Sequence, residues 1–393
     1  MLHVIARSAL ASACLVTTRA SGDGASTRKI EPPVVEIMRL PEGGVQPQAV
    51  VGADGSINVI YLAGDPAASN VFFMRSTDGG RTFAKPIRVN STPGSAVAAG
   101  TIRGAHLALG RDGRIHIAWN GSMQTHSGGD PQAGGSLLYT RSNEDATAFE
   151  PERAMAIRGL DGGGSIAASD AGQVSIVWHA PPSGKTGEQA RRIWLSRSGD
   201  DGETFDEPVA IDAPPRGACA CCSLRAFMTA AGDLFVLYRT AATPSDRDMT
   251  LIRVHAEEID LNLIEPWPIG QCVMSSASFV ETGDGVLGAW ETKRRIRFAS
   301  LPGQSDDSST EIIEPAGQGD NAKHPVLAVN REGAILCAWT ENTGWAQGGD
   351  IAWQVFEPSG APIESAAGRA PRLPVWGSPA AFARDDGTFV ILY

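Results

Sequence analysis

The stretch HLALGRDGRIHIAW, which runs from His106 to Trp119, decides how the whole chain is interpreted. Apolar residues alternate with other residues on both sides of Asp112-Gly113, and an Asp-Gly pair between two alternating runs predicts a β-hairpin. The second run ends on the aromatic residue Trp119, seven positions after Asp112. The stretch therefore predicts two short antiparallel strands joined by a tight turn.

This hairpin pattern recurs along the chain. In six of the seven copies the aromatic residue follows the first turn position by seven residues, and in the fifth copy it follows by six. The other turns and their aromatic residues are Asp54-Gly55 and Tyr61, Ala171-Gly172 and Trp178, Ala231-Gly232 and Tyr238, Asp284-Gly285 and Trp290, Glu332-Gly333 and Trp339, and Asp386-Gly387 and Tyr393. Successive turns are 58, 59, 60, 53, 48 and 54 residues apart, a period that indicates a repeat architecture.

Each repeat has room for four strands, as the first one shows at 48–53, 57–62, 70–76 and 85–90. Four antiparallel strands repeated seven times predict an all-β chain folded as a seven-bladed β-propeller. The last repeat ends at Tyr393, directly after its second strand. We expect the strand at 34–40 to complete that blade, because this would join the two ends of the ring and remove an open edge. A six-bladed propeller is the alternative.

A second motif lies in the turn after the third strand. Ser76–Phe83 (STDGGRTF) and Ser198–Phe205 (SGDDGETF) both fit Ser-x-Asp-x-Gly-x-Thr-Phe, and Ser142–Phe149 (SNEDATAF) is a degraded copy. A short carboxylate can accept backbone N–H bonds within such a turn, and glycine supplies the positive φ that it needs. The motif is the Asp box, and through it the chain resembles the sialidase (BNR-repeat) superfamily of propellers, in which the box is structural.

The resemblance implies a carbohydrate-active protein, with exo-glycosidase-like hydrolysis as the expected activity. Sialidases use an arginine triad, a tyrosine nucleophile paired with a glutamate, and an aspartic acid. The four tyrosines of this chain occupy positions that look structural: Tyr61, Tyr139, Tyr238 and Tyr393. None is expected to be free as a nucleophile, so hydrolysis would have to use two carboxylates. A non-catalytic glycan- or protein-binding propeller is the alternative.

Composition narrows the partners. The formal net charge is −11, the isoelectric point is about 5.2, and no basic patch stands out. Nucleic acid is therefore not an expected partner. No apolar stretch approaches the ~20 residues of a membrane span. We expect a monomer without a cofactor that binds a glycan or another small polar ligand.

The N-terminal segment 1–28 is expected to be an export signal followed by a disordered tail, and 29–393 to be the single propeller domain. Arg7 precedes SALASACLV and then a run rich in small polar residues, as in a signal peptide. Ala11–Cys14 resembles a bacterial lipobox, so Cys14 is a candidate lipid anchor. The expected location is periplasmic or extracellular.

The face opposite the tight turns is the expected functional face, because the connections after the second strand of most repeats are long and loops on a rigid scaffold often carry function. Eight and six residues before each turn stands a row of polar or small residues, which should face a wet central channel because side chains alternate along a strand. This row and the loops beside it supply the candidate residues. The candidate substrate-binding residues are Arg103, His106, Arg225, Arg239, Lys323, His324, Trp345 and Trp376, and the candidate catalytic carboxylates are Asp161, Glu291 and Glu341.

Four cysteines stand where the first strands of repeats four and five begin: Cys219, Cys221, Cys222 and Cys272. In an exported protein the first interpretation is a disulfide between Cys272 and one of the other three. Two disulfides are also open. A thiolate site for zinc or copper(I), with His106 or His324 as a further ligand, is another alternative.

Overall fold

The computed structural model describes residues 32–125, 135–160, 162–302 and 311–393, which belong to one compact unit, Pro32–Tyr393. Within these residues the strands form seven sheets, as expected for a seven-bladed propeller. The proposed export signal and Cys14 lie outside the described residues. In the described part of the chain, no helix is long and apolar enough to cross a membrane.

The strand bounds follow the predicted hairpins. The first blade contains β2 (Val45–Val51), β3 (Ile57–Asp65), β4 (Ala68–Ser76) and β5 (Ile87–Arg88), and the second contains β6 (His106–Leu109), β7 (Ile115–Asn120), β8 (Gly135–Arg141) and β9 (Arg153–Leu160). The third contains β10 (Gly164–Ala168), β11 (Val174–Ala180), β12 (Arg192–Ser198) and β13 (Val209–Ala210), and the fourth contains β14 (Arg225–Met228), β15 (Leu234–Arg239), β16 (Met249–His255) and β17 (Glu258–Glu265).

The fifth blade contains β18 (Ala277–Thr282), β19 (Gly285–Thr292) and β20 (Arg295–Ser300), and the sixth contains β21 (Lys323–Val329), β22 (Ile335–Glu341), β23 (Gly349–Phe356) and β24 (Pro362–Leu373). In the fifth blade an isolated bridge between Phe298 and Ile313 stands where the first four blades and the sixth have a fourth strand. Short 3-10 turns occur at η1 (Pro41–Gly43), η2 (Arg111–Gly113), η3 (Met123–Thr125) and η5 (Glu188–Ala190).

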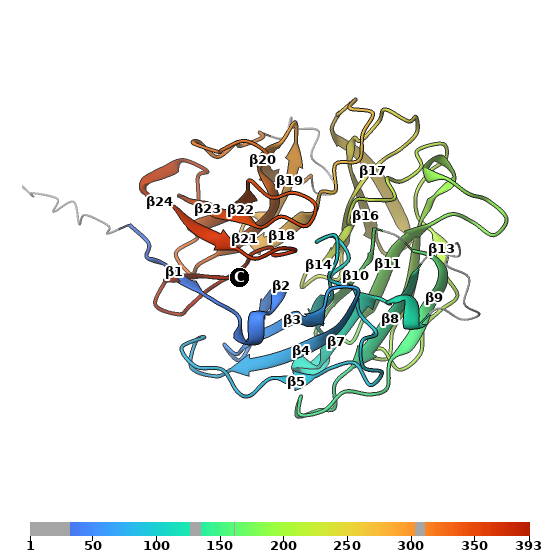
Figure 1. Cartoon of the computed structure of the whole chain (residues 1–393), viewed down its shortest axis with the longest axis horizontal. Helices are drawn as coiled ribbons and strands as arrows, with labels where there is room; N and C mark the ends of the chain where they lie inside the picture. Colours follow the sequence, from blue (N-terminus) through green and yellow to red (C-terminus); the bar gives the residue numbers. More distant parts are fainter. Residues whose placement is uncertain (1–31, 126–134, 161, 303–310) are drawn as a thin grey trace, which may run out of the picture. The chain divides into compact units, whose positions relative to one another are not determined.

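The seventh blade joins the two ends of the described chain. β25 (Ala380–Ala383) and β26 (Phe389–Leu392) form its hairpin, and β1 (Val35–Met38) pairs in parallel with β26. Figure 1 shows β1 beside the C-terminal strands. The innermost strands then contact one another in the order β2, β6, β10, β14, β18, β21, β25 and back to β2. The N-terminal strand therefore closes the ring, as predicted.

The core lies between neighbouring blades. Ile60 and Leu62 of the first blade, for example, pack with Leu107 and Ile117 of the second. The second strand of each hairpin is buried on both faces because blades cover it from both sides. All four tyrosines belong to this packing and are at most 7% exposed.

The two complete Ser-x-Asp turns have the same hydrogen bonds. Ser76 Oγ donates to Asp78 Oδ1 (2.7 Å), and Asp78 accepts bonds from the N–H and the hydroxyl of Thr82 (2.9 and 2.6 Å). Ser198, Asp200 and Thr204 repeat this arrangement. These bonds hold the pKa of both aspartates well below its usual range, and both carboxylates are committed to the turns.

Candidate functional site

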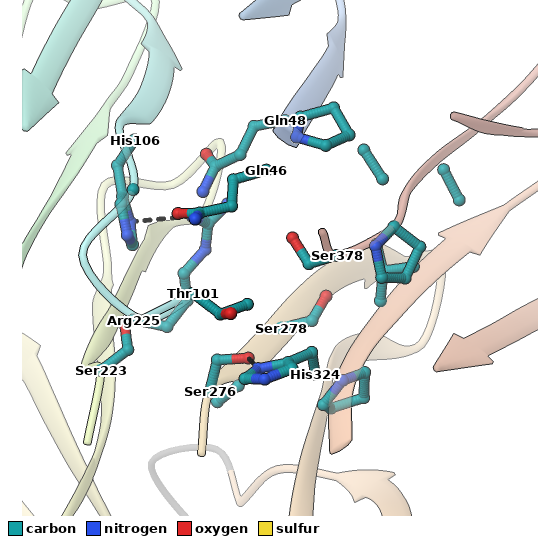
Figure 2. Close-up of a pocket in the computed structure, with 18 of the residues that line it drawn as sticks. Gln46, Gln48, Thr101, His106, Ser223, Arg225, Ser276, Ser278, His324 and Ser378 are labelled. Atoms are coloured by element: carbon teal, nitrogen blue, oxygen red, sulfur yellow. Dashed lines mark hydrogen bonds between the residues drawn. The ribbon is translucent and has the colours of Figure 1, made fainter. Parts of the chain in front are cut away.

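A polar cavity of about 130 Å³ lies where the first strands of several blades meet, and it includes much of the polar row predicted from strand alternation. Figure 2 shows its labelled side chains, with His106 and Arg225 on one side and His324 and Ser276 on the other. Its polar lining residues are Gln46, Gln48, Thr101, His106, Ser223, Arg225, Ser276, Ser278, His324 and Ser378. The cavity can hold several water molecules or part of a small polar ligand.

Arg225 supplies the only side-chain cation among the described residues that line this cavity. Its Nη1 donates to His106 Nδ1 (2.9 Å), which also contacts Ser165 Oγ (2.8 Å). A guanidinium can only donate, so Nδ1 must be the unprotonated nitrogen of the ring. Burial and the charge of Arg225 lower the pKa of His106 well below its usual value. His106 is therefore a neutral acceptor that orients the arginine.

Arg225 has no carboxylate partner in the described part of the chain. The ion pairs of the described residues do not include it, and burial lowers its pKa to about 10. An arginine placed in a cavity without a counter-ion is suited to bind an anionic group of a ligand, above all a planar carboxylate.

Two β-bulges shape the cavity. The pairing register shifts between Val45 and Gln48 in β2 and between Lys323 and Val326 in β21. Gln46 and His324, which lie inside these shifts, have positive φ angles of 52° and 51°. Bulges of this kind turn a side chain away from the regular alternation. Strained backbone at non-glycine residues often marks functional sites.

His324 is the second histidine of the cavity. Its Nδ1 lies 3.0 Å from Ser276 Oγ, and burial together with Lys323 lowers its pKa to about 3. His324 is therefore neutral at physiological pH. With neutral histidines, serines and glutamines around one arginine, the cavity offers many hydrogen-bond partners and a single positive charge.

A second cavity of about 60 Å³ adjoins the first and shares Thr101 and His324 with it. Trp345 and Trp376 form one wall, with ring centroids 4.8 Å apart and ring planes at 76°. The Trp345 side chain is 64% exposed, so much of its surface remains open to a ligand. Lys323 also lines this cavity and donates to the Val273 carbonyl (2.5 Å). Aromatic faces next to polar donors suit a sugar ring.

The structure therefore gathers six of the eight candidate binding residues around these two cavities. They are His106, Arg225, Lys323, His324, Trp345 and Trp376. Arg103 does not line either cavity, and its Nη1 donates to the Ala99 carbonyl (3.1 Å). Arg239 is 2% exposed and donates to Ser275 Oγ and to the Arg247 carbonyl. Arg239 is a buried loop support because these contacts use its guanidinium inside the protein.

The candidate catalytic carboxylates do not share one location or one set of contacts. Asp161 lies outside the described residues. Glu341 is fully buried, and its carboxylate accepts bonds from Trp339 Nε1 (2.8 Å), the Gly319 N–H (2.7 Å) and Arg369. These contacts give Glu341 a structural role in the sixth blade, which corrects the sequence-based expectation that it faces a ligand.

Glu291 is also buried, but one of its oxygens is unsatisfied. It is 1% exposed, and Oε2 has no hydrogen-bond partner among the described residues. Burial raises the pKa of Glu291 to about 7, although Lys323 and Arg239 oppose the shift. It does not line either cavity. Within the described lining of both cavities there is no carboxylate, so no pair of carboxylates faces a ligand there.

Sequence reasoning missed Thr101, a loop residue with a φ of 54° that lines both cavities. It comes from the connection between the first and second blades, where neither alternation nor a motif marks it. Met274, with a φ of 47°, likewise enters the second cavity from a loop.

The cysteines lie close together beside Arg239. Cys221 and Cys272 form a disulfide, which is one of the pairings that the sequence left open. Cys219 Sγ lies 2.8 Å from Cys222 Sγ and 3.5 Å from Cys221 Sγ. The three sulfur atoms of Cys219, Cys221 and Cys222 lie within 4.8 Å of one another. Neither His106 nor His324 joins this group, because both make their contacts in the polar cavity.

No protein-family model and no curated protein matches this chain. Several solved structures are similar to it. A protein of unknown function from Dyadobacter fermentans is similar with a TM-score of 0.57 and 17% identity, over 83% of this chain and 98% of that one. An α-L-arabinofuranosidase from Fusarium graminearum is similar with a TM-score of 0.54 and 11% identity, over 83% and 98%.

An α-L-arabinanase from Penicillium chrysogenum, solved with arabinobiose, is similar with a TM-score of 0.52 and 12% identity, over 82% of this chain and 95% of that one. At these identities the similarity concerns the fold. The similarity agrees with the predicted β-propeller fold.

Proposed function

We propose that this propeller recognises carbohydrate, and that its two adjoining cavities hold a sugar that carries a carboxylate. The observation that carries the proposal is Arg225, a guanidinium with no ion-pair partner among the described residues, held by His106 in the wall of a polar cavity. The Trp345 and Trp376 pair next to it supplies an apolar wall for a sugar ring. The similarity in fold to an α-L-arabinanase and an α-L-arabinofuranosidase agrees with a glycan ligand.

The proposal favours binding over hydrolysis. Glycoside hydrolysis in most families needs two carboxyl groups on either side of the scissile bond. The described walls of the two cavities contain none, and Glu341 is committed to Trp339, Gly319 and Arg369.

The test compares pairs of sugars that differ only in the acid group, such as galacturonate and galactose, by isothermal titration calorimetry. A charge-assisted hydrogen bond is worth about 1.5–3 kcal/mol, so the acid should bind roughly tenfold or more tightly. Arg225→Met should remove this preference. Arg331→Met is the matched control, because Arg331 is exposed and pairs with Glu332 in a turn outside the cavities. Equal affinity for both sugars, or an unchanged preference in Arg225→Met, would contradict the proposal.

A second candidate function is hydrolysis with Glu291 as the general acid. A carboxyl group with a pKa of about 7 is protonated in a useful fraction at neutral pH. Glu291 interacts electrostatically with Lys323, which lines the second cavity. Release of aryl glycosides by the wild-type chain and its loss in Glu291→Gln would support hydrolysis over binding alone.

A further inference from the structure

The four clustered cysteines combine a half-exposed disulfide with a buried pair of thiols. Cys272 is exposed, and Cys221 is partly buried. Cys219 and Cys222 are 1% and 2% exposed and pack with Trp267 and Val273. The carbohydrate proposal makes no use of this group. In the sequence Cys-Ala-Cys-Cys, the buried Cys219 and Cys222 are three residues apart, and Cys221 of the disulfide lies between them.

The loop that carries these cysteines is held firmly from a neighbouring blade. The Ala220 N–H donates to Glu188 Oε1 (2.7 Å), and Glu188 also pairs with Arg247 (2.7 Å). The Cys219 N–H donates to the Arg239 carbonyl, and His179 Nε2 lies 3.1 Å from the Cys222 carbonyl. A β-carbon on Gly162 would lie 2.3 Å from that same carbonyl, so the loop is also packed closely. The sulfur atoms are thus positioned by the fold rather than by chance proximity of mobile side chains.

The surroundings lower the pKa of Cys222 and raise the pKa of Cys219. The Cys219 S–H points to Cys222 Sγ at 2.8 Å. Burial raises the pKa of Cys222, but the bond from Cys219, the Arg239 guanidinium and the Ser275 N–H outweigh it, and the net shift is downward. The bond to Cys222, together with burial, raises the pKa of Cys219. When the pair holds one proton, the short Cys219–Cys222 contact gives that proton a direct path from Cys219 to Cys222 as Cys219 attacks.

We propose that Cys219 and Cys222 are a redox-active dithiol that passes its electrons to the Cys221–Cys272 disulfide and thereby exposes a reactive thiol at the surface. The Cys219 sulfur, 3.5 Å from Cys221 Sγ, attacks it while its proton passes to Cys222. The bond between Cys219 and Cys221 forms, the bond between Cys221 and Cys272 breaks, and Cys272 leaves as a thiolate that takes a proton from water.

A second exchange completes the transfer. Cys222 attacks the Cys219 sulfur and a Cys219–Cys222 disulfide forms. The Cys219–Cys221 bond breaks, and Cys221 takes the proton of Cys222 and leaves as a thiol. Two electrons have then moved from the inner pair to the outer pair, and no outside oxidant is consumed. The outer dithiol can next reduce an external disulfide of the glutathione type to two thiols, which restores the Cys221–Cys272 bond. The external substrate class is therefore a small disulfide that reaches Cys272.

The experiment uses the full chain. A glutathione buffer first brings the four clustered cysteines to a state with one disulfide, and the glutathione is then removed under nitrogen. A maleimide is added without any reductant, and the labelled and bonded cysteines are mapped by mass spectrometry. We expect Cys272 to become labelled in the wild-type chain, and to be labelled at least tenfold more slowly in Cys219→Ser. Cys337→Ser is the matched control, because Cys337 is a fully buried thiol of the sixth blade and its loss should leave the labelling of Cys272 unchanged.

Three results would overturn the proposal. Cys272 could remain bonded and unlabelled in the wild-type chain while Cys219 and Cys222 are free. The labelling rate could be the same in Cys219→Ser, whose native fold is checked by its circular dichroism and thermal melt. Elemental analysis could find an equivalent of zinc or copper held by the thiols, which would make the cluster a metal site. A shift between Cys221–Cys272 and Cys219–Cys222 disulfides across glutathione ratios in the wild-type chain would support the proposal independently of any variant.

Discussion

The substitution Glu291→Gln tests the electrostatics beside the cavities most directly. Glu291 is 1% exposed, and burial raises its pKa from the usual 4.5 to about 7. Since the folded protein holds this proton more tightly than the unfolded chain does, the protonated carboxyl stabilises the fold fully below pH 4.5. That contribution is lost as the pH rises through about 7. Glutamine keeps the shape of the protonated acid and cannot ionise.

The magnitude follows from the shift. A difference of about 2.5 pH units corresponds to roughly 3 kcal/mol, because one unit is worth about 1.4 kcal/mol. The free energy of unfolding of the wild-type chain should therefore fall relative to Glu291→Gln by an amount of this order between pH 4.5 and pH 8. Most of the change should lie below pH 7, and the difference should level off above it.

The assay is denaturant unfolding of both proteins at a series of pH values, followed by tryptophan fluorescence. Glu281→Gln provides a control, because Glu281 is exposed in the same blade. The reasoning would be refuted if the free energies of unfolding of the wild-type chain and of Glu291→Gln differ by the same amount across this pH range. It would mean that Lys323 and Arg239 keep Glu291 ionised throughout.

Three further predictions test the fold and the site. Deletion of residues 1–38 removes β1 and exposes the edge of β26, so it should lower the unfolding temperature and promote aggregation. Deletion of residues 1–31 is the control and should do neither. Equal unfolding temperatures of the two truncated chains would contradict the closing role of β1. Gly80→Ala should lower the free energy of unfolding more than Gly55→Ala does. Both glycines have positive φ (77° and 76°), so both substitutions strain the backbone. Only at Gly80 would the new β-carbon also meet a side chain, at 2.4 Å from the Phe382 ring. Denaturant unfolding should show a cost of about 1–2 kcal/mol for Gly55→Ala and a larger one for Gly80→Ala, and equal costs would refute the packing argument. Trp345→Ala should weaken sugar binding several-fold in calorimetry with little change in the melt, since the Trp345 side chain is 64% exposed; an unchanged affinity would remove the aromatic wall from the site.

The sequence alone was sufficient for the repeat, the hairpins and the closing strand. These features rest on local physics: alternation along a strand, the positive φ of glycine in the turns, and the need to cover an open strand edge. The same alternation identified the row of first-strand residues that contains His106, Arg225 and His324. Because every blade repeats one plan, a pattern read in one copy could be checked against the other six.

Only the tertiary structure decided what those residues do. Gln46 and His324 enter the cavity through bulges that depend on how β2 and β21 pair with their neighbours, and Thr101 enters from a loop. Arg225 and His106 are 119 residues apart and meet because the fourth and second blades both face the channel. Glu341 proved structural, Glu291 became a buried carboxyl with a raised pKa, and Cys221 rather than its neighbours bonded to Cys272. Burial, ion pairing and sulfur geometry depend on what the other blades place beside a residue, and closure of the ring sets those distances rather than any local sequence pattern.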